Sequence, residues 1–308
     1  MQLVECVPNF SEGRRQDVVE AIRGAAAGVP GITVLDLHAD HTHNRMVLTF
    51  VGDPAAVSEA AFRCAEQAAL LIDMTVQQGE HPRIGATDVI PFIPISGVTM
   101  DDCVALANAV GQRIGDELSI PVYLYSRAAR RPERVRLPDV RRGQYEGLRE
   151  LIETDPDRAP DFGPARIGTA GATAVGARPF LVAYNINLAT DDLALAKSIA
   201  KGIRESSGGL KAVQALGMAT DDPNVVQVSM NLLDTAVTPL HVVFETVSEQ
   251  AVAAGVEVIE SEIVGLLPMD VLVTTTRTRI KARELEASQI VEARLLQALS
   301  TADPPSDA

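Results

Sequence analysis

A short turn at residues 79–88 carries an acid, an imidazole and a guanidinium between glycines. Its sequence is Gly79-Glu80-His81-Pro82-Arg83-Ile84-Gly85-Ala86-Thr87-Asp88. Pro82 fixes its own φ and biases His81 towards extended backbone, so the chain itself sets the direction of the imidazole. An unperturbed imidazole titrates near neutral pH, and a guanidinium can hold a carboxylate through two parallel hydrogen bonds. The turn therefore predicts proton transfer by His81 on an anionic substrate, with Arg83 or Arg45 binding carboxylates.

Three further histidines lie close together in residues 38–45, with Asp40 among them: His38, His41 and His43. With Glu80 and His81 they offer enough donors for a zinc or iron site, which would indicate a metallohydrolase. The alternative is a polar hairpin tip whose histidines are solvated or line a cleft. We favour the hairpin tip and expect no bound metal. The fifth histidine, His241, lies on an apolar helical face and is interpreted as a buried or boundary residue.

A glycine-rich passage at residues 163–173 lacks the strand and helix context of a dinucleotide or phosphate-binding loop. Its glycines would allow close backbone approach to a flat ligand, and the alternative is a plain linker between domains. Polar side chains also occupy positions in or beside strands where apolar residues are expected: Asn9, Asn185 and Asn187. We interpret these asparagines as hydrogen-bonding a ligand, with turn capping as the alternative for Asn9.

Hydrophobic spacing predicts the elements that must position these residues. The first half should form strands at 2–8, 31–38, 45–52 and 87–94 and helices at 14–28 and 54–71, in the order βαββαβ. The same order recurs over 179–264, as strand 180–187, helix 191–206, strands 212–219 and 224–232, helix 239–254 and strand 256–264. Between the two sets we expect a helix at 100–118, a strand at 121–125 and a helix near 143–153. A final helix should span 285–300.

This repeated order predicts an α+β protein of two ferredoxin-like βαββαβ subdomains, each an antiparallel sheet with its helices on one side. The uncovered sheets would then face each other across a substrate cleft. We expect an N-terminal subdomain at 1–176, a C-terminal subdomain at 177–300 and a flexible tail at 301–308, whose residues neither pack nor continue a helix.

Length and composition limit the classes of function. With 308 residues, 46% of them hydrophobic, the chain can bury a sizeable core, and its net charge of −14 argues against nucleic acid as a partner. To bind an anion, so acidic a protein must gather cations locally. The cations near glycine turns or polar motifs are Arg45, Arg83, Arg166, Arg178 and Lys211. We interpret the arginines of residues 127–142 as a solvated surface run.

The lack of a recognisable targeting signal and the spacing of the cysteines favour a cytoplasmic protein. The first strand begins directly, without the basic and apolar regions of a leader, and no apolar stretch approaches about eighteen residues, so we expect no membrane association. Three widely spaced cysteines suit reduced thiols that pack in the core: Cys6, Cys64 and Cys103.

Motifs from about residue 2 to about residue 270 closely resemble the glutamate formimidoyltransferase family and follow its order. They are Leu3-Val4-Glu5-Cys6-Val7-Pro8-Asn9-Phe10-Ser11-Glu12-Gly13, the turn 79–85, Pro91-Phe92-Ile93-Pro94, Pro121-Val122-Tyr123-Leu124-Tyr125, Ala159-Pro160-Asp161-Phe162-Gly163-Pro164, Ala183-Tyr184-Asn185-Ile186-Asn187-Leu188, Val213-Gln214, Asn231-Leu232-Leu233-Asp234 and Val264-Gly265-Leu266. In vertebrates this module is fused to a cyclodeaminase. The resemblance implies a stand-alone transferase here, with a separate cyclodeaminase as a possible partner.

The resemblance also implies two subdomains with a tunnel between them, a homodimer, and tetrahydrofolate and L-glutamate as substrates, with no metal. By motif match His81 is the catalytic histidine. The family's folate-binding segment falls on Gly163, Pro164, Ala165, Arg166, Ile167, Gly168, Thr169, Ala170 and Gly171. Relatives can carry an aromatic residue at the place of Ala170. In vertebrate members an aspartate suggested to assist catalysis takes the place of His38, and an imidazole there can still relay protons.

We therefore expect reversible transfer of a formimidoyl group between N5 of tetrahydrofolate and the α-nitrogen of glutamate, a reaction of histidine degradation and one-carbon metabolism. His81 would act first as general base and then as general acid. Three alternatives remain open. The donor could be 5-formyltetrahydrofolate, the protein could be a metallohydrolase using its clustered histidines, or it could bind reduced folate without turnover.

Overall fold

The computed structural model describes residues 1–79 and 81–295 of the chain. The chain divides into two compact units between Pro179 and Phe180. Each unit combines helices with its own β-sheet, so the protein is α+β, as predicted. Among the described residues, no helix has the length and apolar character that crossing a membrane requires.

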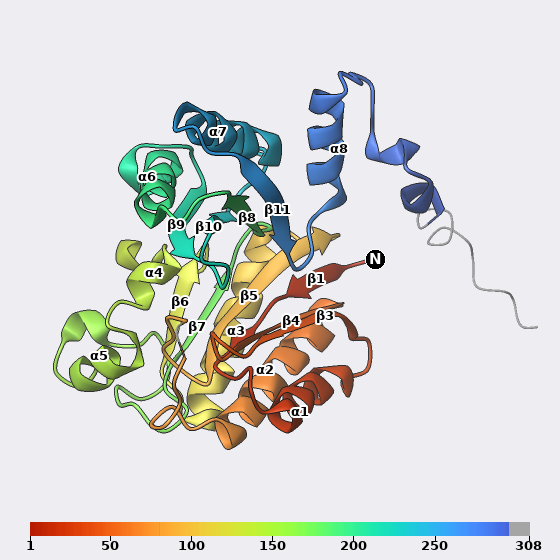
Figure 1. The fold of residues 1–308 in the computed structure, drawn as a ribbon. Coiled ribbons are helices and arrows are strands. Elements are labelled where there is room, and N and C mark those ends of the chain that lie inside the picture. Colours follow the sequence, from red (N-terminus) through yellow and green to blue (C-terminus); the bar gives the residue numbers. More distant parts are fainter. Residues whose placement is uncertain (80, 296–308) are drawn as a thin grey trace, which may run out of the picture. The chain divides into compact units, whose positions relative to one another are not determined.

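The first sheet has seven strands with two kinds of pairing (Figure 1). Its antiparallel part consists of β3 (Thr33–Asp40), β4 (Arg45–Gly52), β1 (Leu3–Cys6) with β2 (Asn9–Phe10), and β5 (Thr87–Ser96). The short strands β1 and β2 both pair with β4 and β5, so together they fill one place in the sheet. Beyond β5, the strands β7 (Thr173–Ala177) and β6 (Val122–Ser126) continue the sheet in parallel.

The prediction of a purely antiparallel first sheet is therefore wrong. Strand β7 was not predicted because its sequence, Thr-Ala-Val-Gly-Ala, is short and lacks clear alternation. It is nevertheless buried along its whole length, since it lies between two other strands. Its position brings the end of the glycine-rich passage next to the start of β5.

Three helices cover one face of the first sheet: α1 (Gln16–Ala27), α2 (Pro54–Leu71) and α3 (Met100–Leu118) (Figure 1). Helix α2 begins sharply because the Asp53 side chain accepts hydrogen bonds from the first free N–H groups and Pro54 occupies the first helical position. Cys6, Cys64 and Cys103 are buried in the resulting core, as predicted. Because strand side chains alternate, Glu5, Asn9 and Arg45 point to the other face.

On that other face, two short helices pack over β5, β7 and β6: α4 (Leu137–Val140) and α5 (Gln144–Leu151). A second apolar cluster fills the space beneath them, with Tyr123, Tyr125 and Leu148 among its buried members. Short 3₁₀ turns at Pro132–Arg134 and Pro156–Arg158 complete the connection to β7.

The second unit has the element order that the sequence predicted over 179–264. Its strands are β8 (Val182–Leu188), β9 (Val213–Ala219), β10 (Val226–Leu232) and β11 (Val258–Val264), arranged as β11-β8-β10-β9 with all neighbours antiparallel. The helices α6 (Leu193–Ile203) and α7 (Leu240–Ala253) pack on one face over an aliphatic core.

The end of the described chain differs from the prediction. Helix α8 (Met269–Arg279) was not predicted, because its β-branched valines and threonines have low helix propensity. Its buried Val271 packs into the second core and stabilises the helix. The helix predicted at 285–300 is wrong at its start, where Ala287–Gln289 forms a 3₁₀ turn, although residues 291–295 are helical. Residues 296–300 and the predicted tail lie outside the described residues.

Candidate active site

His81 lines a small, narrow pocket in the first unit. The lining side chains come from β2, the start of β4, the loop after α2, and the turn into β5. They are Asn9, Phe10, Ser11, Asn44, Arg45, Gln77, His81, Arg83 and Asp88. The structure thus brings together four residues that the sequence predicted for the site: Asn9, Arg45, His81 and Arg83.

Glycines and one asparagine hold the segments around this pocket together. A Cβ on Gly79 would lie 2.4 Å from the carbonyl oxygen of His43, and one on Gly13 would lie 2.2 Å from that of Asp40. Only glycine permits such close backbone contact. The Asn44 side chain accepts from the Gly13 N–H at 3.0 Å and donates to the Gln78 carbonyl at 2.8 Å. Asn44 was not predicted for the site, because its positive φ of 48° gives no signal in a single sequence.

The imidazole of His81 is held in its neutral form. Burial is the largest cause and the nearby charges of Arg45 and Arg141 act in the same direction, and together they lower its pKa to about 2. A general base must begin unprotonated, and His81 meets that condition at any physiological pH. A pKa this low also makes the imidazole a weak base, so a bound anion that offsets the arginine charges would strengthen it.

Arg45 approaches His81 and is oriented by Asn9. Its Nε donates to Oδ1 of Asn9 at 3.1 Å, and its Nη2 donates to the same oxygen. Asn9 in turn donates from Nδ2 to the Val7 carbonyl at 2.9 Å, so both ends of its amide are engaged. Burial and the charge of Arg141 lower the pKa of Arg45 to about 10. The guanidinium is therefore charged at neutral pH and is oriented by a neutral group.

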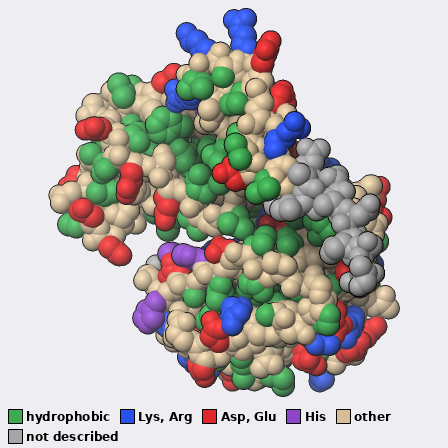
Figure 2. Space-filling view, turned by 90° about the vertical axis from the view of Figure 1, so that its right-hand side faces the viewer, with side chains coloured by type: hydrophobic (Ala, Val, Ile, Leu, Met, Phe, Trp, Pro, Cys, Tyr) green, Lys and Arg blue, Asp and Glu red, His purple; other side chains and the backbone are tan. Residues whose placement is uncertain are grey.

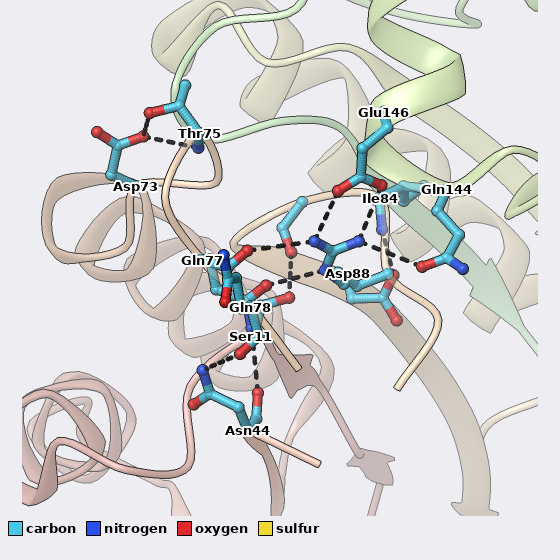
Figure 3. Close-up of polar contacts among 12 residues, drawn as sticks. Ser11, Asn44, Asp73, Thr75, Gln77, Gln78, Ile84, Asp88, Gln144 and Glu146 are labelled. Atoms are coloured by element: carbon cyan, nitrogen blue, oxygen red, sulfur yellow. Dashed lines mark hydrogen bonds and ion pairs between the residues drawn. The ribbon is translucent and has the colours of Figure 1, made fainter. Parts of the chain in front are cut away.

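Arg83 is saturated with protein acceptors, and the three residues that supply them, Gln77, Gln144 and Glu146, are labelled in Figure 3. Its Nη1 and Nη2 donate to the two carboxylate oxygens of Glu146 at 3.0 and 2.8 Å. Nε donates to Gln77 Oε1 at 2.9 Å, and the remaining bonds go to the Gln77 carbonyl and to Gln144 Oε1, both at 3.2 Å. All five N–H groups of the guanidinium are used. In this structure Arg83 connects the turn to α5, which gives no support to the expectation that it binds substrate carboxylates.

Within the run at 127–142, Arg134 is buried and Arg141 is mostly buried, so the interpretation of the run as a solvated surface is wrong for these two. Arg134 donates to Asp161 Oδ2 at 2.8 Å, and the side chains of both residues are at most 6% exposed. Arg141 donates from Nη2 to Oδ2 of Asp88. Apolar residues interleave with these arginines, and that pattern was an available signal against a fully solvated run.

Asp88 connects Arg141 to the His81 turn, and the sequence analysis did not select it. Its side chain is 3% exposed, and its Oδ1 accepts the N–H of Ile84 at 2.9 Å. A single acid within the apolar strand β5 was the signal for this role. Asp88 therefore sets the backbone of the turn and the position of a buried cation together.

The glycine-rich passage lies beside the same turn. Ala86 donates its N–H to the Ala170 carbonyl at 2.8 Å, and Ala172 donates to the Ile84 carbonyl at 2.9 Å. A Cβ on Gly171 would lie 2.4 Å from the oxygen of Ile84. On Gly163 it would lie 2.4 Å from the oxygen of Ile120, and both glycines have positive φ. These two glycines allow close contact with protein backbone, and their part in ligand binding stays a prediction.

Gly168 differs from those glycines because nothing lies within 4 Å of the position its Cβ would take. Arg166 is exposed, and the Thr169 carbonyl accepts the N–H of Met74 at 2.8 Å. Ile167 packs against both apolar clusters of the first unit. The passage thus has a packed side and an open side.

The histidines of residues 38–45 do not converge. His38 and His41 are exposed, and histidine side chains are visible at the surface in Figure 2. His43 instead turns to Asp40, whose Oδ1 accepts its N–H at 2.8 Å and whose Oδ2 lies 2.9 Å from its Nδ1. Within residues 1–79 and 81–295, no three His, Cys, Asp or Glu side chains are grouped to hold a metal ion. His241 is buried, in line with its interpretation.

Asn185 and Asn187 lie in the second unit, on strand β8. They donate to Glu262 and Glu260 of β11, each at 3.0 Å. Gln227 of β10 donates to Asn187 Oδ1, also at 3.0 Å. These side chains form a polar ladder across three strands, on the face opposite the helices.

Sequence comparison agrees with this arrangement. Residues 3–178 match the N-terminal subdomain of the formiminotransferase domain, and residues 183–298 match the formiminotransferase domain. A glutamate formimidoyltransferase of Thermoplasma acidophilum is 46% identical over 300 residues, covering 97% of this chain and 99% of that protein. One from Streptococcus pyogenes serotype M1 is 46% identical, with 96% and 99% covered. The formimidoyltransferase-cyclodeaminase of Sus scrofa is 50% identical over 88% of this chain and 51% of that protein. The chain belongs to the formiminotransferase family.

Proposed function

We propose that this protein is a glutamate formimidoyltransferase, which moves a formimidoyl group between N5 of tetrahydrofolate and the α-nitrogen of L-glutamate. The observation that carries the proposal is the neutral imidazole of His81 beside Arg45 in a pocket of the first unit. Two relatives that bear this name match the chain over nearly its full length.

His81 handles the protons of the transfer. It takes one proton from the α-ammonium group of glutamate, and the freed nitrogen bonds to the formimidoyl carbon. The bond from that carbon to N5 breaks as N5 receives a proton through the same imidazole. The formimidoyl group is a protonated amidine both in the donor and in the product. The three protons of the glutamate α-ammonium group are then distributed as follows. One stays on the new nitrogen, one ends on N5, and one leaves to solvent.

Positioning supplies the rest of the catalysis in this proposal. The turn that carries His81 is held by Asp88, by the packing of Gly79, and by hydrogen bonds to the glycine-rich passage. Such fixed geometry lets two bound substrates react without further ordering. No step of this chemistry needs a metal ion.

The folate subsite is proposed along the glycine-rich passage, from Gly163 to Gly171. Its open side at Gly168, the exposed Arg166 and its contact with the His81 turn support this choice. We further propose that His38, Asn185 and Asn187 contribute to substrate binding.

The two subdomains, taken as 1–176 and 177–300, would be ferredoxin-like with their sheets facing across the cleft, in a homodimer. The strand orders of both sheets support the ferredoxin-like part.

The test is steady-state transfer by the purified protein from 5-formimidoyltetrahydrofolate to L-glutamate, with 5-formyltetrahydrofolate as the second donor. We expect N-formimidoylglutamate from the first donor and slower or no transfer from the second. Preference for the formyl donor would establish the formyltransferase instead. Binding of both folates without turnover would establish a folate-binding protein. Loss of activity after metal removal, restored by zinc or iron, would favour the metallohydrolase.

A further inference from the structure

Arg141 is a mostly buried cation whose bonding capacity is only partly used. It reaches Asp88 with Nη2, and its side chain is 14% exposed. Its Nε lies out of contact with solvent and has no hydrogen-bond partner among the described residues. A buried donor without an acceptor is costly, and native proteins keep few of them. In a region that also holds His81, such a donor points to an acceptor that arrives with a ligand.

The charges around His81 lead to the same conclusion. Arg45 and Arg141 both act on the imidazole, so two positive charges lie close to it. Among the described residues, Asp88 is the carboxylate in contact with this pair, and it is bound to Arg141. Asp40 is engaged with His43, and the contacts of Arg45 go to the neutral amide of Asn9. Asp40 also acts on Arg45 electrostatically, but no carboxylate is a hydrogen-bond partner of Arg45 among the described residues, and a carboxylate of a ligand fits that place.

We propose that Arg141 and Arg45 together bind the α-carboxylate of the acceptor amino acid beside His81. The α-carboxylate is chosen over the side-chain carboxylate because it is bonded to the same carbon as the reacting nitrogen. A group held next to His81 therefore delivers that nitrogen to the imidazole. Arg83 is excluded from this task because Gln77, Gln144 and Glu146 already occupy its donors.

The site also explains how a weakly basic histidine can act. When a carboxylate offsets the charges with which the two arginines lower the pKa of His81, the imidazole becomes a stronger base at the moment the ammonium group is beside it. Substrate binding and activation of the base are then one event. This inference rests on the proposed function for its ligand, but its test does not depend on turnover.

The experiment compares Arg141→Lys with Arg134→Lys, which also alters a buried, carboxylate-paired arginine. Lysine keeps the charge but loses the planar fork. Calorimetry with tetrahydrofolate present measures the affinity for L-glutamate and for 4-aminobutanoate, which lacks the α-carboxylate. We expect Arg141→Lys to weaken L-glutamate binding about tenfold or more and to leave 4-aminobutanoate within about twofold. Arg134→Lys should change neither ligand by more than about twofold.

A second readout follows His81 directly. In wild type, saturating L-glutamate should raise the pKa of the labelled imidazole measured by NMR, and Arg141→Lys should reduce that rise. Unchanged L-glutamate affinity in a folded Arg141→Lys protein would overturn the proposal. If that variant does not fold, Arg45→Lys serves in its place, because its contacts are with a neutral amide. Transfer with unchanged affinity would reject the site alone, whereas arginine-dependent binding without transfer would reject the proposed function alone.

Discussion

Two arginines of the first unit with little exposure, Arg83 and Arg141, are alike in sequence context and opposite in bonding. Each lies near glycines, and each meets a carboxylate. Arg83 has every N–H group matched by Gln77, Gln144 or Glu146, whereas Arg141 has one carboxylate and a buried Nε with no described partner. Nearness to a motif does not distinguish the two residues. An arginine that binds a ligand must keep N–H groups without protein acceptors, whereas one that joins two segments has its N–H groups occupied.

The glycines of the same region divide in the same way. Gly171 and Gly85 meet backbone oxygens at distances that no Cβ could share, while Gly168 faces open space. A glycine whose missing Cβ makes room for protein is structural. A glycine with space beside it leaves room for something else. Both contrasts can be tested by substitution.

The largest effect should come from His81, whose imidazole is influenced by the charges of Arg45 and Arg141. His81→Asn should keep the fold and folate binding but lower kcat by about 10² to 10⁴, the usual contribution of acid-base catalysis. Steady-state kinetics and equilibrium folate binding measure the two properties. The control is His41→Asn, an exposed histidine of the neighbouring turn, which should stay within about twofold. Near-normal turnover in His81→Asn would refute its role.

Next in size is the contrast between two glycines of the passage. Gly171→Ala should lower the free energy of unfolding by about 2 to 4 kcal/mol, because a positive φ and a contact with the Ile84 oxygen both oppose the new methyl group. Gly168→Ala should change stability by less than about 0.5 kcal/mol. Denaturant unfolding gives both values. A raised KM for folate in Gly168→Ala alone would identify its open side as the ligand side.

Arg83 should matter for stability and not for substrate. Arg83→Met should lower the free energy of unfolding by about 2 kcal/mol, since it leaves Gln77 and Gln144 without their donor. The KM for glutamate should stay within about twofold of wild type. Glu146→Gln should cost less than about 1 kcal/mol, because that side chain is 61% exposed. A large rise in the glutamate KM in Arg83→Met would return Arg83 to the list of substrate ligands.

The smallest effect concerns acid stability. The pKa of His81 is about 2 in the folded protein and near 6.5 when unfolded, so below pH 6.5 the unfolded chain binds a proton that the folded one does not. Stability from this group is present above pH 6.5 and falls as the pH drops, by at most about 1.4 kcal/mol per pH unit. His81→Asn should therefore lose less stability than wild type between pH 7 and pH 5 in denaturant titrations. Parallel losses in the two proteins would contradict the lowered pKa.

Much of the fold followed from local patterns. The helical spacing of α1, α2 and α3, the alternation of the long strands and the repeated element order of the second unit were all predictable, because burial of one face imposes a period on the sequence. The elements that were missed, β7 and α8, consist of small or β-branched residues whose local preference is weak. Contacts with the rest of the protein decided their structure.

By itself the sequence determined the His81 turn, the family and the grouping of His81 with predicted anion-binding residues. Only the tertiary structure decided which of the arginines keeps hydrogen-bond donors without a protein acceptor. Arg141 meets Asp88 across 53 positions of sequence, and Arg83 meets Glu146 across 63. A residue's type states how many hydrogen bonds it can make, but its remaining capacity depends on neighbours brought from distant segments. That is why Arg83 was expected to bind substrate and Arg141 was taken for surface.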